Sequence, residues 1–158
     1  MGSYTAKLSS IGNIMNNIYL FTYGMLTNKD VMNPDAKLLG AAMLEDWEFE
    51  FLTYANVRPN YNKNTLGVLW HIDSEILREC DMREGYPSVY DREIVPVKHY
   101  NKTYWAWVYT LTQAGRHEYL ESKPSEFYFR TVIEGYVQHG LDFSQLTSYD
   151  SWQSKRKG

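Results

Sequence analysis

Short strand-like segments dominate this sequence. β-branched and aromatic residues are concentrated in six of them, at residues 17–23, 38–44, 47–51, 66–72, 94–98 and 104–111. Short stretches of turn residues separate many of these segments, and two further segments stand out as helical. The sequence therefore predicts an α+β fold, with a mostly antiparallel or mixed sheet and a few helices packed against it.

Details of three segments refine this prediction. Aromatic residues and glutamates alternate in WEFEF at 47–51, so we expect the aromatic side chains to face the core and Glu48 and Glu50 to face water. Residues 55–65 are rich in asparagine and contain one proline, which predicts a loop. Pro96 lies inside the 94–98 segment, which indicates a strand at a sheet edge or a bulge.

The first helical segment is predicted over residues 73–84. Asp73 or Ser74 can cap its first turn with a side-chain oxygen. Gly85 follows the last helical residue, as is typical of a helix C-terminus, and a proline comes two residues later.

A second long helix is predicted over residues 125–139 and is followed by Gly140. Its apolar side chains recur at the spacing of one helix face, at Phe129, Val132, Ile133, Tyr136 and Val137. A shorter helix is predicted at 26–32, with Thr27 or Asn28 as its cap and a proline just beyond it.

Length and composition favour a single domain. The chain has 158 residues, 44% of them hydrophobic, which suits one core and is too short for two domains of ordinary size. We expect this domain to span residues 15–150. Residues 1–14 and 151–158 are expected to be flexible ends or artificial extensions, with Met15 as a candidate natural start.

Charge and residue types argue against several classes of function. A net charge of −3 provides no general attraction to nucleic acids or anionic membranes, so neither is expected as a partner. The single cysteine, Cys80, excludes an internal disulfide and fits the reducing cytoplasm. The four histidines lack the spacing of metal ligands, so no metal site is expected. Phosphate-loop, dinucleotide-loop and serine-hydrolase motifs are absent as well.

Glu84 is the candidate catalytic residue. At about 100° per residue it falls on the apolar face of its predicted helix, between Cys80 and Leu77. Burial and the negative end of the helix both raise the pKa of such a carboxyl group, which can then exchange a proton near neutral pH. The alternative is that Glu84 lies beyond the regular helix, in water or paired with Arg83 or Arg92.

The segment YLFTYGML, residues 19–26, is the candidate binding loop. Its simplest interpretation is a buried strand followed by a turn at Gly24. The other interpretation is that the N–H groups around Gly24–Leu26 point outward together and bind a carboxylate or another anionic oxygen. The residues alone leave both interpretations open.

Four segments in order resemble the γ-glutamylcyclotransferase-like family: YLFTYGML, LGVLWHI, LRECDMREGYPSVYDREIVPV and PSEFYFRTVIEGYVQHGLD. Members of that family have a first strand that ends in Tyr-Gly, a strand with a Gly-Val-hydrophobic-Trp/Tyr pattern, a short helix that ends in Glu-Gly, and a last helix preceded by Pro-Ser. The resemblance covers residues 19–142. It implies a small mixed β-barrel with a few packed helices and a cavity at one side.

The resemblance also implies an activity and a set of site residues. Family members release 5-oxoproline from γ-glutamyl amines or peptides, and they need no metal or cofactor. Glu84 matches the position of the catalytic acid/base. The positions that match the substrate-binding loop and the pocket tyrosines are Tyr23, Gly24, Met25, Leu26, Tyr90 and Tyr128.

Met25 departs from the family pattern, which usually has Ser or Thr at this position. The chain therefore lacks one loop hydroxyl, although its backbone donors remain, and Thr27 is the nearest substitute.

Two functions are compatible with these residues. The first is an enzyme acting on a small γ-glutamyl amine, and the second is a non-catalytic module that uses the same cavity to bind a ligand or a partner protein. The sequence specifies neither the γ-glutamyl substrate nor an oligomeric state.

Overall fold

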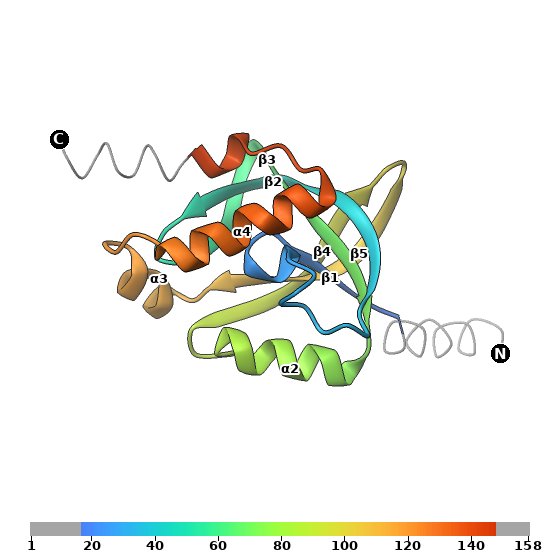
Figure 1. The fold of residues 1–158 in the computed structure, drawn as a ribbon, viewed down its shortest axis with the longest axis horizontal. Helices are drawn as coiled ribbons and strands as arrows, with labels where there is room; N and C mark the ends of the chain where they lie inside the picture. Colours follow the sequence, from blue (N-terminus) through green and yellow to red (C-terminus); the bar gives the residue numbers. More distant parts are fainter. Residues whose placement is uncertain (1–16, 148–158) are drawn as a thin grey trace.

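Five strands close into a β-barrel in the computed structural model, which describes residues 17–147 (Figure 1). The barrel order is β1-β3-β2-β4-β5. β1 runs antiparallel to β3 and parallel to β5, so the barrel is mixed, as the resemblance implied. The strands are β1 Ile18–Thr22, β2 Lys37–Phe51, β3 Ala55–Ile72, β4 Tyr90–His99 and β5 Lys102–Leu111. The expected ends at 1–14 and 151–158 lie outside the described residues.

Helices pack on different sides of the barrel. Figure 1 shows α2 along one side and α4 across another, with the short helix η1 between them. None of the helices within residues 17–147 is long and apolar enough to cross a membrane. The helices are α2 Ser74–Glu84, α3 Gln113–Tyr119, α4 Glu126–His139 and the 3₁₀ helices η1 Met25–Thr27 and η2 Ser144–Thr147.

The core fills the barrel and continues beneath α4. Val132 and Tyr136 of α4 are fully buried. The largest fully buried side chains from the strands are Leu20, Phe21, Leu44, Phe51, Val57, Val68, Leu69, Val97 and Val108. These side chains come from all five strands, so every strand of the barrel contributes to the core.

Residues 55–65 are a strand, so the prediction of a loop here was wrong. They form the first part of β3 and pair with β2, with Pro59 opposite Trp47. Residues 58–64 are all exposed, so this part of the strand has no buried face and no apolar alternation. Side-chain hydrogen bonds to β2 support it instead, such as the 2.7 Å bond that Asn60 donates to Glu48.

The alternation at 47–51 is only partly confirmed. Phe49 and Phe51 are buried, whereas Trp47 is half-buried. Glu50 does not simply face water, because Arg116 of α3 donates two hydrogen bonds to its carboxylate, at 2.8 and 3.0 Å. The sequence analysis did not predict α3, so this partner was missing.

The two long helices are confirmed with their caps. Asp73 accepts a 2.9 Å hydrogen bond from the Ile76 N–H, and Gly85 ends α2 in the left-handed conformation at φ 66°. α4 begins after Ser125 and ends at Gly140, also left-handed. Val137 is the exception on the predicted apolar face of α4, since it is 63% exposed.

The predicted helix at 26–32 is wrong in length and in its cap. Only Met25–Thr27 form a 3₁₀ turn, and Gly24 precedes it without any side-chain cap. Thr27 lies inside this turn and cannot cap it. Asn28 bonds instead to α4, where its side-chain amide donates to the Thr131 carbonyl at 2.9 Å.

Pro96 lies where its residue type predicts. β4 pairs with β5 along its whole length, with Pro96 opposite Trp105. Among the described residues, β4 pairs with β2 only through Lys98 and Met43. Most of β4 therefore has a hydrogen-bonded neighbour on one side only, which tolerates the missing N–H of proline.

Candidate active site

A small pocket opens at the end of β1, and every site residue predicted from the sequence lines it. The enclosed volume is about 30 Å³. It adjoins a wider cleft of about 350 Å³, with which it shares Met25, Glu84, Tyr90 and Tyr128. The full lining of the inner pocket is Phe21, Thr22, Tyr23, Gly24, Met25, Leu26, Ala55, Glu84, Tyr90, Tyr109 and Tyr128.

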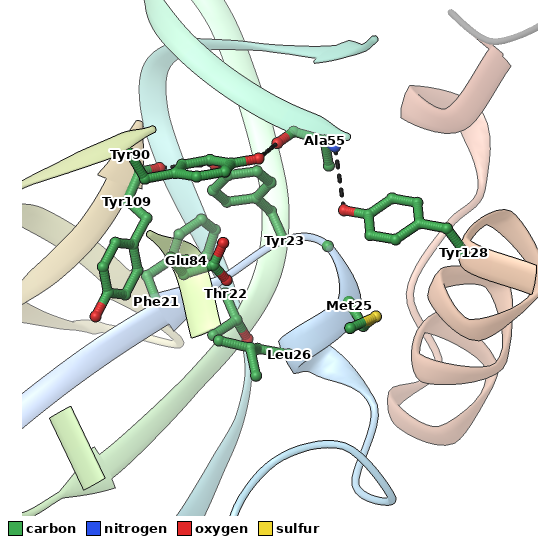
Figure 2. Close-up of a pocket in the computed structure, with 11 residues that line it drawn as sticks. Phe21, Thr22, Tyr23, Met25, Leu26, Ala55, Glu84, Tyr90, Tyr109 and Tyr128 are labelled. Carbon is green, nitrogen blue, oxygen red and sulfur yellow. Dashed lines mark hydrogen bonds between the residues drawn. The ribbon is translucent and has the colours of Figure 1, made fainter. Parts of the chain in front are cut away.

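Glu84 is the acidic residue of this pocket. It is the last residue of α2, and Figure 2 shows its carboxyl group pointing toward the pocket centre, with Tyr90 and Tyr109 on one side and Met25 and Leu26 on the other. Within residues 17–147, no hydrogen bond or ion pair joins this carboxyl group to another side chain. Burial raises the pKa of Glu84 to about 7, and the nearby Arg83 charge opposes this only in part.

Arg92, which could have paired with Glu84, has a different partner. Its guanidinium donates two hydrogen bonds to Asp81, at 2.8 and 3.1 Å. It also stacks between the rings of Tyr86 and Trp107, 4.4 and 4.2 Å from their centroids. These contacts hold Arg92 one helical turn away from Glu84 and leave the Glu84 carboxyl group unneutralised.

The Gly24–Leu26 loop is a tight turn against the pocket. The Thr27 and Asn28 N–H groups donate to the Gly24 and Met25 carbonyls, both at 3.1 Å. Glycine suits position 24 because the space beside it is tight, and not because the backbone is left-handed, since its φ is −122°. A Cβ atom at Gly24 would lie 3.1 Å from both the Ala55 Cβ and the Tyr128 hydroxyl oxygen.

Thr27 does not replace the hydroxyl that Met25 lacks. Its side chain is fully buried and donates a 2.7 Å hydrogen bond to the Gly24 carbonyl. The residue is therefore part of the loop's internal structure and does not line the inner pocket.

Four tyrosines line the pocket around the carboxyl group, and two of them, Tyr23 and Tyr90, donate to the backbone. Tyr23 donates to the Tyr109 carbonyl at 2.6 Å, and Tyr90 donates to the Ala55 carbonyl at 2.7 Å. Burial raises the pKa of both phenols well above the usual range, so both stay neutral.

Tyr128 differs because its oxygen is an acceptor. The Ala55 N–H donates to it at 3.1 Å, as Figure 2 shows, and the Met25 N–H also contributes a hydrogen bond. Burial raises the pKa of the Tyr128 phenol, while these two backbone donors oppose the increase. A hydroxyl that accepts two hydrogen bonds is a stronger donor of its own proton, so Tyr128 can donate to a ligand in the pocket.

The sequence analysis missed Ala55 and Tyr109. Ala55 uses both its N–H and its carbonyl to hold Tyr128 and Tyr90, but it lies in the segment mistaken for a loop. Tyr109 donates a 2.6 Å hydrogen bond to Asp81 and accepts one from Tyr23 at its carbonyl. Backbone roles of this kind have no residue-type signature, so the pattern offered no signal for them.

Two further residues of the lining, Phe21 and Thr22, belong to the strand that the sequence identified. Phe21 lies in β1, two positions before Tyr23, which follows the last residue of the strand. Their rings are 6.5 Å apart. The Thr22 hydroxyl donates to the Val68 carbonyl at 3.1 Å and so links β1 to β3.

Among the residues that the structure describes, no group of three His, Cys, Asp or Glu side chains is arranged to hold a metal ion.

Comparison with known proteins identifies related sequences and folds. A family model described as γ-glutamyl cyclotransferase, AIG2-like, matches residues 20–130. No curated protein matches the sequence. The similar solved structures include an uncharacterized human protein, which is 22% identical over 84% of this chain and 86% of its own, with a TM-score of 0.70.

Two other solved structures carry informative names. A γ-glutamyl cyclotransferase is 20% identical over 84% of this chain and 86% of its own, with a TM-score of 0.69. A yeast γ-glutamyl cyclotransferase described as specific to glutathione is 13% identical over 87% of this chain and 97% of its own, with a TM-score of 0.56. At these identities the likeness establishes the shared fold.

Proposed function

This chain belongs to the γ-glutamyl cyclotransferase, AIG2-like family, and we propose that it is an enzyme that releases 5-oxoproline from a γ-glutamyl amine or peptide, with Glu84 as the general acid/base. One observation carries the proposal. Glu84 is half-buried, its carboxyl group has no charged partner within the described residues, and its pKa is raised to about 7 in a pocket that also contains the Gly24–Leu26 loop.

The reaction is an intramolecular displacement. The substrate's α-nitrogen attacks its own γ-carbonyl carbon, the new C–N bond closes a five-membered ring, and the amide C–N bond breaks. Because nucleophile and electrophile belong to the same molecule, the pocket only has to favour the folded conformer. No redox step is involved.

Proton transfer is the remaining task. The α-ammonium carries three protons and the ring nitrogen of 5-oxoproline keeps one. The two protons it loses are the two that the amide nitrogen gains when it leaves as an ammonium ion. Glu84 takes each proton as a carboxylate and returns it as a carboxylic acid, and a pKa of about 7 makes both directions accessible near neutral pH.

Neutral hydrogen-bond donors in the pocket can stabilise the negative charges that form or persist on the substrate's oxygens. The γ-carbonyl oxygen becomes negative in the tetrahedral intermediate, and the substrate's α-carboxylate is negative throughout. The Tyr128 hydroxyl and the Leu26 N–H group of η1 are candidate donors to these oxygens. We infer that Tyr128 supplies the side-chain donor that Met25 cannot supply.

The substrate class follows from the same chemistry. A γ-glutamyl group is required, because only its α-amine can close the five-membered ring. The yeast relative is described as specific to glutathione, which makes glutathione one of the γ-glutamyl compounds to test. The wider cleft next to Glu84 is large enough for a leaving amine beyond the γ-glutamyl group.

The test is direct. The protein and its Glu84→Gln variant are incubated with glutathione, γ-glutamyl amino acids and ε-(γ-glutamyl)-lysine, and 5-oxoproline is measured by mass spectrometry. We expect release by the parent protein and a loss of roughly 10²–10⁴-fold in the variant, the range typical of removing a general acid/base. An exposed carboxylate on β4 offers a matched control, and Glu93→Gln should retain full activity.

The rival function, a non-catalytic binding module, predicts a different outcome. The parent would release no 5-oxoproline from any of the compounds, while the parent and Glu84→Gln would bind one of them equally well in calorimetry. That result would exclude the enzyme.

A further inference from the structure

The wider cleft that adjoins the inner pocket has a wall of aromatic rings. Tyr54 lies in the turn between β2 and β3, and its ring meets Tyr119 of α3 at 4.9 Å and Tyr128 of α4 at 5.1 Å, both edge to face. All three rings line the cleft. Tyr128 also lines the inner pocket, so the aromatic wall begins where the inner pocket ends.

Backbone contacts hold this wall in place. The Thr53 N–H donates to the Tyr119 carbonyl at 3.2 Å, and the Thr53 hydroxyl donates to the Ser122 carbonyl at 2.9 Å. These bonds join the end of α3 to the β2–β3 turn without using the tyrosine side chains. The rings are therefore held in position and remain free to contact a ligand.

Other side chains add apolar surface to the cleft. Met25, Met82 and Val89 contribute to it, and Met82 is 80% exposed. Tyr54 is itself 38% exposed. An apolar group placed here would cover surface that is now in contact with water, which is favourable.

Only two charged side chains line the cleft among the described residues. Glu84 faces the inner pocket as well, whereas Arg83 belongs to the cleft alone. The cleft therefore offers a cation at its edge and no carboxylate beyond the one assigned to proton transfer. A ligand group with negative charge is favoured here over one with positive charge.

We propose that this cleft selects the leaving amine, and that it favours an aromatic or large apolar amino acid whose carboxylate pairs with Arg83. The preferred substrate class is then a γ-glutamyl aromatic amino acid, and ε-(γ-glutamyl)-lysine, which carries an additional cation, is disfavoured. This inference rests on the proposed function, since it assigns the group that leaves when the γ-glutamyl ring closes.

The position of the cleft supports this assignment. The γ-glutamyl group needs the Glu84 carboxyl group at its α-nitrogen, and the same carboxyl group must also reach the leaving nitrogen. Glu84 lies in the lining of both cavities. A substrate that spans the two cavities therefore places its scissile amide beside Glu84 and its leaving side chain against the tyrosine wall.

The experiment compares values of kcat/KM for 5-oxoproline release from four compounds: γ-glutamyl-phenylalanine, γ-glutamyl-glycine, γ-glutamyl-phenethylamine and ε-(γ-glutamyl)-lysine. We expect γ-glutamyl-phenylalanine to exceed γ-glutamyl-glycine by about tenfold or more, the scale expected for burying a large apolar side chain. The lysine compound should have the lowest kcat/KM. The phenethylamine compound has no leaving-group carboxylate, so its kcat/KM should lie between those of the phenylalanine and lysine compounds.

Two variants separate the two contacts. Tyr119→Ala should lower the ratio of kcat/KM for γ-glutamyl-phenylalanine to kcat/KM for γ-glutamyl-glycine. We expect a decrease of roughly fivefold to tenfold, in line with loss of an aromatic contact. Arg83→Gln should reduce the preference for the phenylalanine over the phenethylamine compound. Tyr61→Ala is the matched control, because Tyr61 is 79% exposed and lines neither cavity, and it should change neither ratio.

The outcomes distinguish this inference from the proposed function. If neither these four compounds nor glutathione releases 5-oxoproline, the proposed function fails and this inference fails with it. If glutathione alone is turned over, the proposed function stands and the leaving-group assignment is wrong. If the glycine or lysine compound is turned over as well as or better than the phenylalanine compound, the proposed function stands and the leaving-group assignment is wrong. The substrate comparison uses the parent protein, so it does not depend on the folding of any variant.

Discussion

At the scale of the residue, Glu84 combines a reactive protonation state with a cost in stability. A carboxyl group at the C-terminal end of a helix receives no stabilisation from the helix dipole, and this one has no charged partner within the described chain. Its pKa of about 7 follows mainly from burial, which penalises the charged form. Activity and stability should therefore respond to pH in opposite directions.

The pH dependence of activity is the first consequence. If Glu84 must be ionised in the free enzyme to accept a proton, kcat/KM should rise with pH and level off above about pH 7, because the Glu84 pKa is raised to that value. Initial rates of 5-oxoproline release, measured across this pH range in buffers of constant ionic strength, give the rising part of the pH–rate profile. A limb near the usual glutamate pKa of about 4.3 would contradict the assignment.

The pH dependence of stability is the second. The native state holds the Glu84 proton up to about pH 7, whereas the unfolded chain releases it near 4.5. Ionising Glu84 therefore lowers the free energy of unfolding as the pH rises between these values, by about 3 kcal/mol. Glutamine is neutral throughout and avoids this loss, so Glu84→Gln should be the more stable protein at about pH 8.

Thermal unfolding at about pH 5 and pH 8 checks this prediction. The variant should unfold several degrees above the parent at the higher pH, and the difference should shrink at the lower pH. Glu93→Gln, an exposed substitution on β4, should show no such pattern. A variant that is equally destabilised at both pH values would mean that the native carboxylate has a partner.

At the scale of the element, α4 fixes the binding loop. Tyr136 donates to the Tyr23 carbonyl at 2.5 Å, and a His139 ring nitrogen lies 2.7 Å from the Thr27 carbonyl. Gly135 lets the helix approach the loop closely. A Cβ atom there would lie 2.1 Å from the Thr27 hydroxyl oxygen and 2.9 Å from the Asn28 nitrogen.

Gly135→Ala tests this packing. Alanine favours a helix by about 1 kcal/mol over glycine, but the overlap with η1 should outweigh this gain, giving a net destabilisation of about 1–3 kcal/mol. Activity should also fall, because the Gly24–Leu26 loop must move. Urea unfolding and 5-oxoproline release measure both effects.

A double-mutant cycle with Thr27→Ala identifies the cause. Removing the hydroxyl takes away the closest atom, so the penalty of Gly135→Ala should shrink in that background. Glu134→Ala, an exposed substitution on the same helix, should cost little. Equal penalties in both backgrounds would rule out the Thr27 contact as the cause.

At the scale of the whole molecule, the barrel contains a close approach of β1 to β3. Gly67 lies in the LGVLWHI segment and is buried where these strands pair. A Cβ atom at this position would lie 2.2 Å from the Thr22 carbonyl oxygen and 2.5 Å from the Phe21 ring. Both of those residues also line the inner pocket, so the barrel and the site share this contact.

Gly67→Ala should therefore destabilise the entire fold. Its nearest obstacle is backbone, which cannot move without breaking the β1–β3 pairing, so we expect a loss of about 3 kcal/mol or more in the free energy of unfolding. Urea unfolding monitored by circular dichroism measures this loss. Lys63→Ala, in the exposed part of β3, should change it by less than about 0.5 kcal/mol. A variant as stable as the parent would show that the strands can separate at this point without loss.

Much of this architecture is readable from the sequence because local burial leaves a periodic pattern. Five of the six predicted strand segments lie within observed strands, and the sixth extends only one residue beyond each end of β1. The two long helices are confirmed with their caps. The phase of α2 placed Glu84 on the inner face, since helical geometry fixes the direction of a side chain relative to its neighbours. The resemblance to the family then supplied the site residues, all of which line the inner pocket.

Only the tertiary structure decided how those elements meet. The exposed half of β3 is ordered by backbone pairing with β2, which does not require an apolar pattern. Ala55 orients two tyrosines through its backbone, and Thr27 turns its hydroxyl to the loop. Gly67 and Gly135 are needed because another segment passes within van der Waals distance. A sequence pattern reports which residues are buried along one segment, whereas contacts between distant segments depend on the path of the whole chain.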